Sequence, residues 1–117
     1  MITFASRLSV YLHRQPVDFR KQINGLSVIV QDGLSLDPFA ESCFVFTNRQ
    51  YNRIKILYWY RNGFCLWMKR LEKDSFAWPR SHKDNTVTLS VEELHWLLDG
   101  FDIWQKPPHQ TLKYAAV

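Results

Sequence analysis

The stretch Arg53-Ile-Lys-Ile-Leu-Tyr-Trp-Tyr-Arg-Asn-Gly-Phe-Cys-Leu-Trp-Met-Lys-Arg70 decides the fold, because it has the pattern of a β-hairpin. Aromatic and β-branched residues, which favour strands, fill both halves, and Asn62-Gly63 supplies a turn. Cationic and large aromatic side chains are interleaved along the hairpin. This combination is typical of a surface that binds a polyanion with flat faces, which means nucleic acid.

The turn at residues 61–63 decides which side chains of the hairpin share a face. A two-residue Asn-Gly turn would pair Tyr60 with Cys65 and mix apolar and charged side chains on both faces. A three-residue loop with Gly63 in the left-handed conformation would instead pair Tyr60 with Phe64. We favour this second register, because it makes one face apolar and the other basic and aromatic. The apolar face would carry Ile54, Ile56, Tyr58, Tyr60, Phe64, Leu66 and Met68, and the other face Arg53, Lys55, Leu57, Trp59, Cys65, Trp67 and Lys69.

The positive charge of the chain is concentrated around this hairpin. Residues 49–83 hold nine Lys and Arg against two Asp and Glu, residues 1–48 hold four against four, and residues 84–117 hold two against five. The formal net charge of +4 is therefore local. A local basic excess is an argument for a polyanionic partner.

Upstream of the hairpin, the sequence predicts one strand, one helix and a second strand. Alternating side chains indicate a strand over residues 8–13. After Pro16, Asp18 is a plausible N-cap for a helix, and Asp32-Gly33 would end it. The helical stripe consists of Phe19, Ile23, Leu26 and Val30. Pro38 makes residues 34–41 a loop, and the strand of residues 43–48 follows.

Downstream, residues 80–85 read as an exposed loop and residues 86–89 as a short strand. Ser90 and Glu93 form a capping box for a second helix, which Gly100 would close. We therefore predict an α+β fold, in which an antiparallel β-meander packs with two α-helices. At 117 residues, the chain is expected to form one domain over residues 1–106 with a tail over residues 107–117.

The spacing of polar residues does not favour a nuclease site, a zinc site, a Ser/His/Asp triad or a glycine-rich phosphate loop. A nuclease needs carboxylates that converge on metal ions, but most acids here have a local role at a helix end or a turn. The four histidines and two cysteines show no closely spaced pair of zinc ligands, and there is no G-x-S-x-G turn or glycine-rich phosphate loop. We expect no catalytic residues, no metal and no cofactor.

Composition also bears on location. No segment approaches the ~20 apolar residues that span a bilayer, and the N-terminus lacks the pattern of a secretory signal. Two cysteines indicate no disulfide framework. A soluble cytoplasmic protein is expected.

Ordered sequence blocks resemble one known family. They are Val10 to Lys21, Ile23-Asn-Gly-Leu26, Phe44 to Arg49, Ile54 to Trp59, Asn62-Gly-Phe64, Leu66-Trp67, Lys69 to Glu72, Phe76-Ala-Trp-Pro79, and the set Leu94, Leu97, Leu98 and Gly100. The chain resembles the small accessory protein, usually called TnpB, of insertion sequence 66 type bacterial transposable elements. Pro16-Val-Asp-Phe-Arg-Lys21 and Asn62-Gly-Phe64 carry most of the likeness, which covers residues 1–100.

The resemblance implies a role in DNA transposition, beside a separate and larger transposase that carries the acidic catalytic residues. The family pattern has no defined catalytic residues, so the candidate site rests on chemistry alone. We predict that DNA binds to Arg49, Arg53, Lys55, Trp59, Arg61, Trp67, Lys69, Arg70, Arg80 and Lys83. Arg14, Arg20 and Lys21 form a weaker basic set, offset by Asp18.

Two alternatives stay open for this surface. A helix could cover the aromatic face of the hairpin, in which case the aromatics belong to the core. The protein could also be an interaction module that docks on the transposase or on a second copy of itself, because large exposed aromatics mark protein interfaces as readily as nucleic-acid sites. DNA and the transposase are therefore the expected partners, a homo-oligomer is a further one, and a membrane is not.

Overall fold

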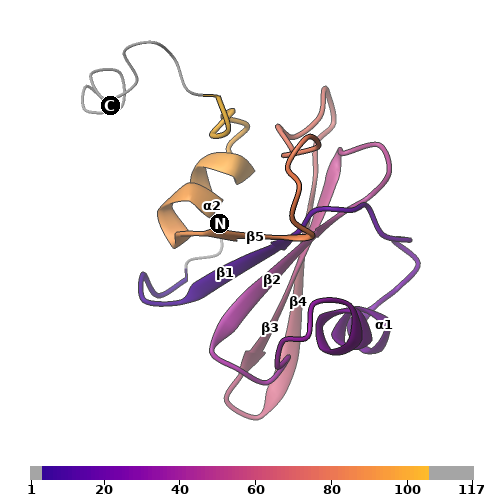
Figure 1. Ribbon diagram of the computed structural model, residues 1–117, viewed down its shortest axis with the longest axis vertical. Helices are drawn as coiled ribbons and strands as arrows, with labels where there is room; N and C mark the ends of the chain where they lie inside the picture. The colour runs from indigo at the N-terminus through magenta and orange to yellow at the C-terminus, as the bar shows by residue number, and fades with distance from the viewer. Residues whose placement is uncertain (1–3, 106–117) are drawn as a thin grey trace.

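The computed structural model describes residues 4–105 and shows a five-stranded sheet with two helices (Figure 1). The elements, in chain order, are β1 (Ser9–His13), α1 (Ile23–Val28), the π-helical turn η1 (Ile29–Gly33), β2 (Ser42–Thr47), β3 (Arg53–Tyr60), β4 (Gly63–Arg70), β5 (Thr86–Leu89) and α2 (Val91–Leu98). The predicted α+β class is confirmed. The tail predicted over residues 107–117 lies outside the described residues.

The strand order in the sheet is β4-β3-β2-β1-β5. Strands β2, β3 and β4 form the predicted antiparallel meander. Strand β1 differs from that pattern, because it pairs with β2 in parallel, while β5 adds to its other side antiparallel. Parallel neighbours need a crossover longer than a tight turn, and the segment that carries α1 and η1 supplies it.

Side chains pack on both faces of the sheet, and the two helices lie on opposite sides of it in Figure 1. The α1 side buries Leu26, Val30, Phe44, Phe46 and Leu57. The α2 side buries a larger cluster: Phe4, Val10, Leu12, Cys43, Val45, Ile54, Ile56, Phe76, Trp78, Val87, Leu89, Val91, Leu94, Leu97 and Leu98. The sheet is thus the middle of three layers, and both faces of its central strands are apolar.

Helix α1 begins later than predicted, because residues 18–21 form a turn. The Asp18 carboxylate accepts hydrogen bonds from the backbone and guanidinium N–H groups of Arg20, and the Lys21 N–H donates to the Asp18 carbonyl at 3.0 Å. The N-cap is Gln22, without a side-chain hydrogen bond. The prediction that Asp18 is the N-cap of this helix was therefore wrong, because the hydrogen bonds of its side chain stabilise a turn instead.

The apolar stripe of this segment is placed as predicted from Ile23 onward. Leu26 and Val30 are fully buried. The helix widens in η1, where the Leu34 N–H donates to the Ile29 carbonyl, and the helical segment ends at Gly33.

The hairpin register differs by one residue from the predicted one. Tyr60 pairs with Gly63, so the turn contains only Arg61 and Asn62. Arg61, rather than Gly63, adopts the left-handed conformation, with φ of 59°. A one-residue shift moves every side chain of β4 to the other face. The single basic and aromatic face that we predicted for this hairpin does not exist.

Helix α2 follows the sequence closely. The Ser90 hydroxyl accepts from the Glu93 N–H, and the Glu93 side chain accepts from the Ser90 N–H, which completes the capping box. Gly100 has φ of 96° just after the last turn, as a glycine at a helix end should.

Candidate functional site

The topology brings three connecting segments to one end of the sheet. Strands β1, β2 and β4 finish at this end, and β3 and β5 begin there. The segments are residues 14–22, 48–53 and 70–85, and we call their shared surface the loop end. The connections after β2 and β4 lie together at the top of Figure 1.

Hydrogen bonds hold the three segments of the loop end together. The Arg14 Nε donates to the Asp84 carbonyl at 2.9 Å, and the Trp78 Nε1 donates to the Arg14 carbonyl at 2.7 Å. The Phe76 N–H donates to the Tyr51 carbonyl at 2.7 Å. Segments that are far apart in sequence therefore form one continuous surface.

This surface is strongly basic. Its segments contain nine Lys and Arg against four Asp and Glu. The cations are Arg14, Arg20, Lys21, Arg49, Arg53, Arg70, Lys73, Arg80 and Lys83, and the acids are Asp18, Glu72, Asp74 and Asp84. Among residues 4–105, the described ion pairs engage Arg20 with Asp18 and Arg70 with Glu72 at this end, and the other cations form none.

Five of the ten predicted site residues gather at the loop end: Arg49, Arg53, Arg70, Arg80 and Lys83. Arg49 and Lys83 are exposed in loops. The guanidinium of Arg80 lies 4.0 Å from the centre of the Tyr51 ring, which orients it by a cation–π contact.

Arg61 and Trp59 lie at the opposite end of the hairpin. A strand of eight residues is roughly 26 Å long, so these two side chains do not share a surface with the loop end. Trp59 packs against Phe39 and Phe64, with ring centres 5.0 Å away in each case.

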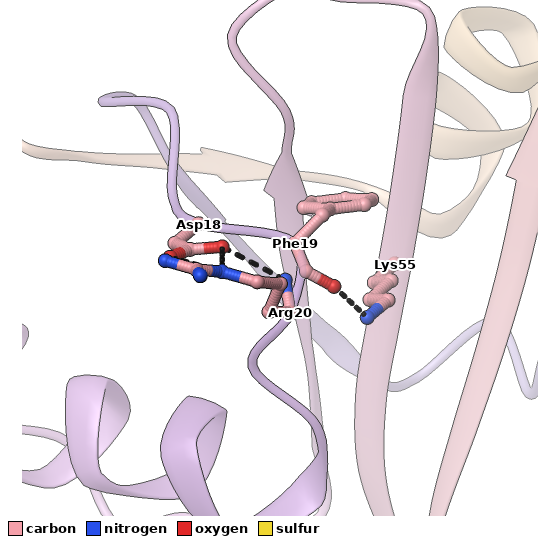
Figure 2. A network of polar contacts seen from close by, with 4 residues as sticks. All are labelled: Asp18, Phe19, Arg20 and Lys55. Carbon is pink, nitrogen blue, oxygen red and sulfur yellow. Dashed lines mark hydrogen bonds and ion pairs between the residues drawn. The ribbon is translucent and has the colours of Figure 1, made fainter.

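Lys55 has a structural role that the sequence did not reveal. Lys55 is 4 % exposed, and its Nζ donates to the carbonyl of Phe19 at 2.9 Å (Figure 2). It also donates to the carbonyl of Lys21 at 2.8 Å. The Gln22 Oε1 lies 3.5 Å away as a third acceptor. Burial lowers the pKa of Lys55, and the charge of Arg53 adds to this effect. The lysine therefore fastens the segment before α1 to the sheet.

Lys69 and Trp67 also face the protein rather than solvent. The Lys69 Nζ donates to the carbonyl of Leu98 at 2.7 Å, which satisfies one of the free carbonyls at the end of α2. Trp67 packs against the core on the α2 side. In the observed register, Trp67 and Lys69 lie on the face opposite to Lys55 and Trp59.

Asp18 is an acid at the loop end whose ionised form is stabilised by a neighbouring arginine. Hydrogen bonds from the Arg20 side chain, followed by one from its backbone, lower the pKa of Asp18 to about 2. The guanidinium Nη2 lies 2.7 Å from Oδ2 (Figure 2). This ion pair offsets the negative charge beside the neighbouring cations.

In the polar turn after β2, Arg49 was a predicted site residue, but Asn48 and Asn52 were not. The Asn48 Oδ1 accepts hydrogen bonds from the N–H groups of Asn52 and Arg53, both at 3.0 Å, and its Nδ2 donates to the Asn52 Oδ1 at 2.7 Å. Arg14, which we ranked as a weak candidate, proves to be a central residue of the loop end. One signal was available: the blocks Val10 to Lys21 and Phe44 to Arg49, which carry part of the family resemblance, meet here.

Comparison with known proteins identifies the family of the chain. The family described as "IS66 Orf2 like protein" matches residues 8–108. The chain belongs to this family. An IS66 Orf2 like protein is an accessory protein of an IS66-type insertion sequence, so a role in transposition follows from membership.

Two relatives from Sinorhizobium fredii (strain NBRC 101917 / NGR234) are similar to this chain over most of its length. "Uncharacterized protein y4jC" is 35% identical over 118 residues, which covers 98% of this chain and 100% of the relative. "Uncharacterized protein y4hO" is 31% identical over 107 residues, or 92% and 91% of the two chains. No solved structure matches the chain significantly.

The described residues contain neither a group of metal ligands nor a membrane-spanning helix. Within residues 4–105, no three His, Cys, Asp or Glu side chains come together in a way that could hold a metal ion. In the same part of the chain, no helix has the length and apolar character needed to cross a membrane.

Proposed function

We propose that this protein binds DNA as a non-catalytic accessory factor in transposition, and that the loop end is its DNA-contacting surface. The observation that carries the proposal is the excess of positive charge at the loop end, where three interlocked segments hold nine cations against four acids. Lys and Arg that neutralise phosphates supply most of the affinity of such a surface. The family supplies the setting, because transposition acts on DNA.

The loop end replaces the hairpin face of our sequence-based hypothesis. The ammonium groups of Lys55 and Lys69 donate hydrogen bonds to backbone carbonyls, which ties both side chains to the protein. Arg49, Arg80 and Lys83, in contrast, are exposed at the loop end. The proposed contact therefore comes from loops, with the sheet as a rigid support.

An electrophoretic shift assay on DNA from the ends of the element tests this proposal. The variant Arg49→Gln with Lys83→Gln removes two exposed charges at the loop end. The control Arg7→Gln with Arg61→Gln removes two at the opposite end, where Arg7 lies 3.8 Å from Glu41. The slope of log affinity against log salt should fall by about 2 in the first variant and stay unchanged in the second. Equal effects in both variants would refute the loop end as the site.

A second function has its own observation in its favour. Phe39 is 57% exposed at the end of the sheet opposite the loop end, and its ring contacts Trp59 and Phe64. An exposed aromatic cluster fits a protein partner, and we propose the transposase as that partner.

A pull-down with the transposase of the same element tests the second function. Phe39→Ser should abolish the association, while Phe101→Ser, which removes a similarly exposed aromatic elsewhere, should not. The association should persist at high salt, because it is apolar. Retention of the association by the Phe39→Ser variant would exclude this cluster.

A further inference from the structure

A pocket lies within the loop end, between the segment before α1 and the turn after β2. Its volume is about 590 Å³. One wall consists of residues 16–19, and the other consists of Asn48, Arg49, Gln50, Asn52 and Arg53. The two walls are more than 25 residues apart in sequence, so only the fold creates the pocket.

Hydrogen bonds hold both walls in place. The Val17 N–H donates to the Thr47 carbonyl at 2.9 Å, and Lys55 holds the carbonyl of Phe19 (Figure 2). On the other side, the Asn48 side chain accepts from the backbone N–H of Arg53. A site whose walls are fixed in advance loses little conformational entropy when a ligand binds.

The charged groups of the pocket suit an anion. Arg49 is exposed at its rim, and the Arg53 side chain is partly buried. The Arg53 Nε is a buried nitrogen that has no hydrogen-bond partner among the described residues. Buried polar nitrogens are usually paired, so an acceptor supplied by a ligand would satisfy a donor that the described residues leave unpaired. The only acid in the lining, Asp18, is neutralised by Arg20.

The size and the remaining lining indicate more than a phosphate group. The volume lies in the range typical of small-molecule sites. Pro16, Val17 and Phe19 add apolar surface next to the two arginines. A nucleotide has the matching parts, an anionic phosphate joined to a flat and largely apolar base.

We infer that this pocket holds one nucleotide unit of the bound DNA. The Arg53 guanidinium contacts the phosphate with help from Arg49, and the sugar and base lie against the wall of Pro16, Val17 and Phe19. This inference rests on the proposed DNA binding and assigns its most specific contact. Arginine suits this position because its planar fork can donate two hydrogen bonds to one phosphate.

Substitutions that keep the charge test the inference. Arg53→Lys retains the positive charge but loses Nε and the fork, and Arg61→Lys is the matched control at the opposite end. We expect Arg53→Lys to bind an oligonucleotide about tenfold more weakly at fixed salt, which corresponds to a loss of ~1.4 kcal/mol in binding free energy. Arg61→Lys should bind the oligonucleotide as tightly as the parent protein does. Thermal melting of both variants confirms that they are folded. Parental affinity of a folded Arg53→Lys variant would overturn the inference.

A second measurement defines the ligand without DNA. Deoxyadenosine monophosphate, titrated in an NMR experiment on the full chain, should shift the amide signals of Val17, Phe19 and Gln50. Inorganic phosphate and deoxyadenosine, as separate titrants, should bind more weakly, because each supplies only one part. Equal binding of inorganic phosphate and the nucleotide would overturn the nucleotide assignment.

The two proposals fail in different ways. A parent protein that does not retain DNA at low salt refutes the proposed function itself. DNA retention by the parent, together with an unchanged Arg53→Lys variant and no amide shifts, refutes only the pocket.

Discussion

At the scale of the residue, Lys55 shows how a single side chain can mislead. Its place between Ile54 and Ile56 in a basic and aromatic strand favoured a contact with phosphates. In the structure, its ammonium group is buried and donates to backbone carbonyls of the segment before α1. A buried cation with several acceptors is a structural element, and removing it leaves those acceptors unsatisfied.

Replacement of Lys55 by methionine should therefore destabilise the protein. We expect a loss of about 2–4 kcal/mol in the free energy of unfolding, because two carbonyls lose a charged donor inside the protein. Urea denaturation of the parent and of the variant measures this difference in the free energy of unfolding. Lys83→Met, at an exposed site, should change stability by less than about 0.5 kcal/mol. If both variants were equally stable, Lys55 would have no structural role.

Asp18 predicts a dependence of stability on pH. Its pKa falls from 3.8 in the unfolded chain to about 2 in the folded protein, because Arg20 stabilises the carboxylate. This contribution is complete above pH 3.8 and is lost as the pH falls toward 2. The melting temperature of Asp18→Asn should consequently vary less between pH 4 and pH 2 than that of the parent. Parallel curves for the two proteins would contradict the assignment.

At the scale of the element, the β3–β4 turn shows which residue carries the unusual conformation. The sequence pointed to Gly63, because glycine adopts positive φ most easily. In the structure, Arg61 adopts it, and Gly63 is the first residue of β4. The register follows from the packing of both hairpin faces in a three-layer fold, which the turn residues alone do not encode.

Substitutions at the turn check this register. Arg61→Gly should raise the free energy of unfolding by about 0.5–1 kcal/mol, because a non-glycine residue is strained at φ of 59°. Gly63→Ala should be tolerated, because its φ is not positive and an added Cβ would meet no atom within 4 Å. Chemical denaturation compares the two. The opposite ranking would support the predicted left-handed Gly63.

At the scale of the whole molecule, the basic residues are divided between two uses. Some fasten the layers together, as Lys55 and Lys69 do, and others form the exposed loop end. Position in sequence does not separate these groups, since Lys69 and Arg70 are neighbours. Only the contacts made across the fold assign each cation to one use.

Chemical footprinting distinguishes the two groups of lysines. An amine-reactive reagent should modify Lys73 and Lys83 in the free protein, because both are exposed, and bound DNA should protect them. Lys55 and Lys69 should react slowly with or without DNA, because their ammonium groups are hydrogen-bonded to carbonyls. Mass spectrometry measures the extent of modification of both pairs of lysines in one sample. Unchanged modification of Lys73 and Lys83 in the complex would exclude the loop end.

Much of the fold was predictable because its signals are local. The hairpin, the capping box of Ser90 and Glu93, and the glycine after α2 depend on neighbouring residues, and the structure shows each of them. The α+β class and the family likeness also followed from ordered sequence blocks. The concentration of charge in residues 49–83 was likewise visible.

The tertiary structure decided the hairpin register, the burial of Lys55 and the meeting of three distant segments at the loop end. These features depend on partners far away in the chain: Lys55 contacts residues 34 and 36 positions earlier, and the Arg14 Nε bonds to a carbonyl 70 positions later. Propensity and periodicity act over a few residues and carry no information about such contacts. The sequence thus determined the elements and the excess of cations, and long-range packing determined which cations remain free to bind.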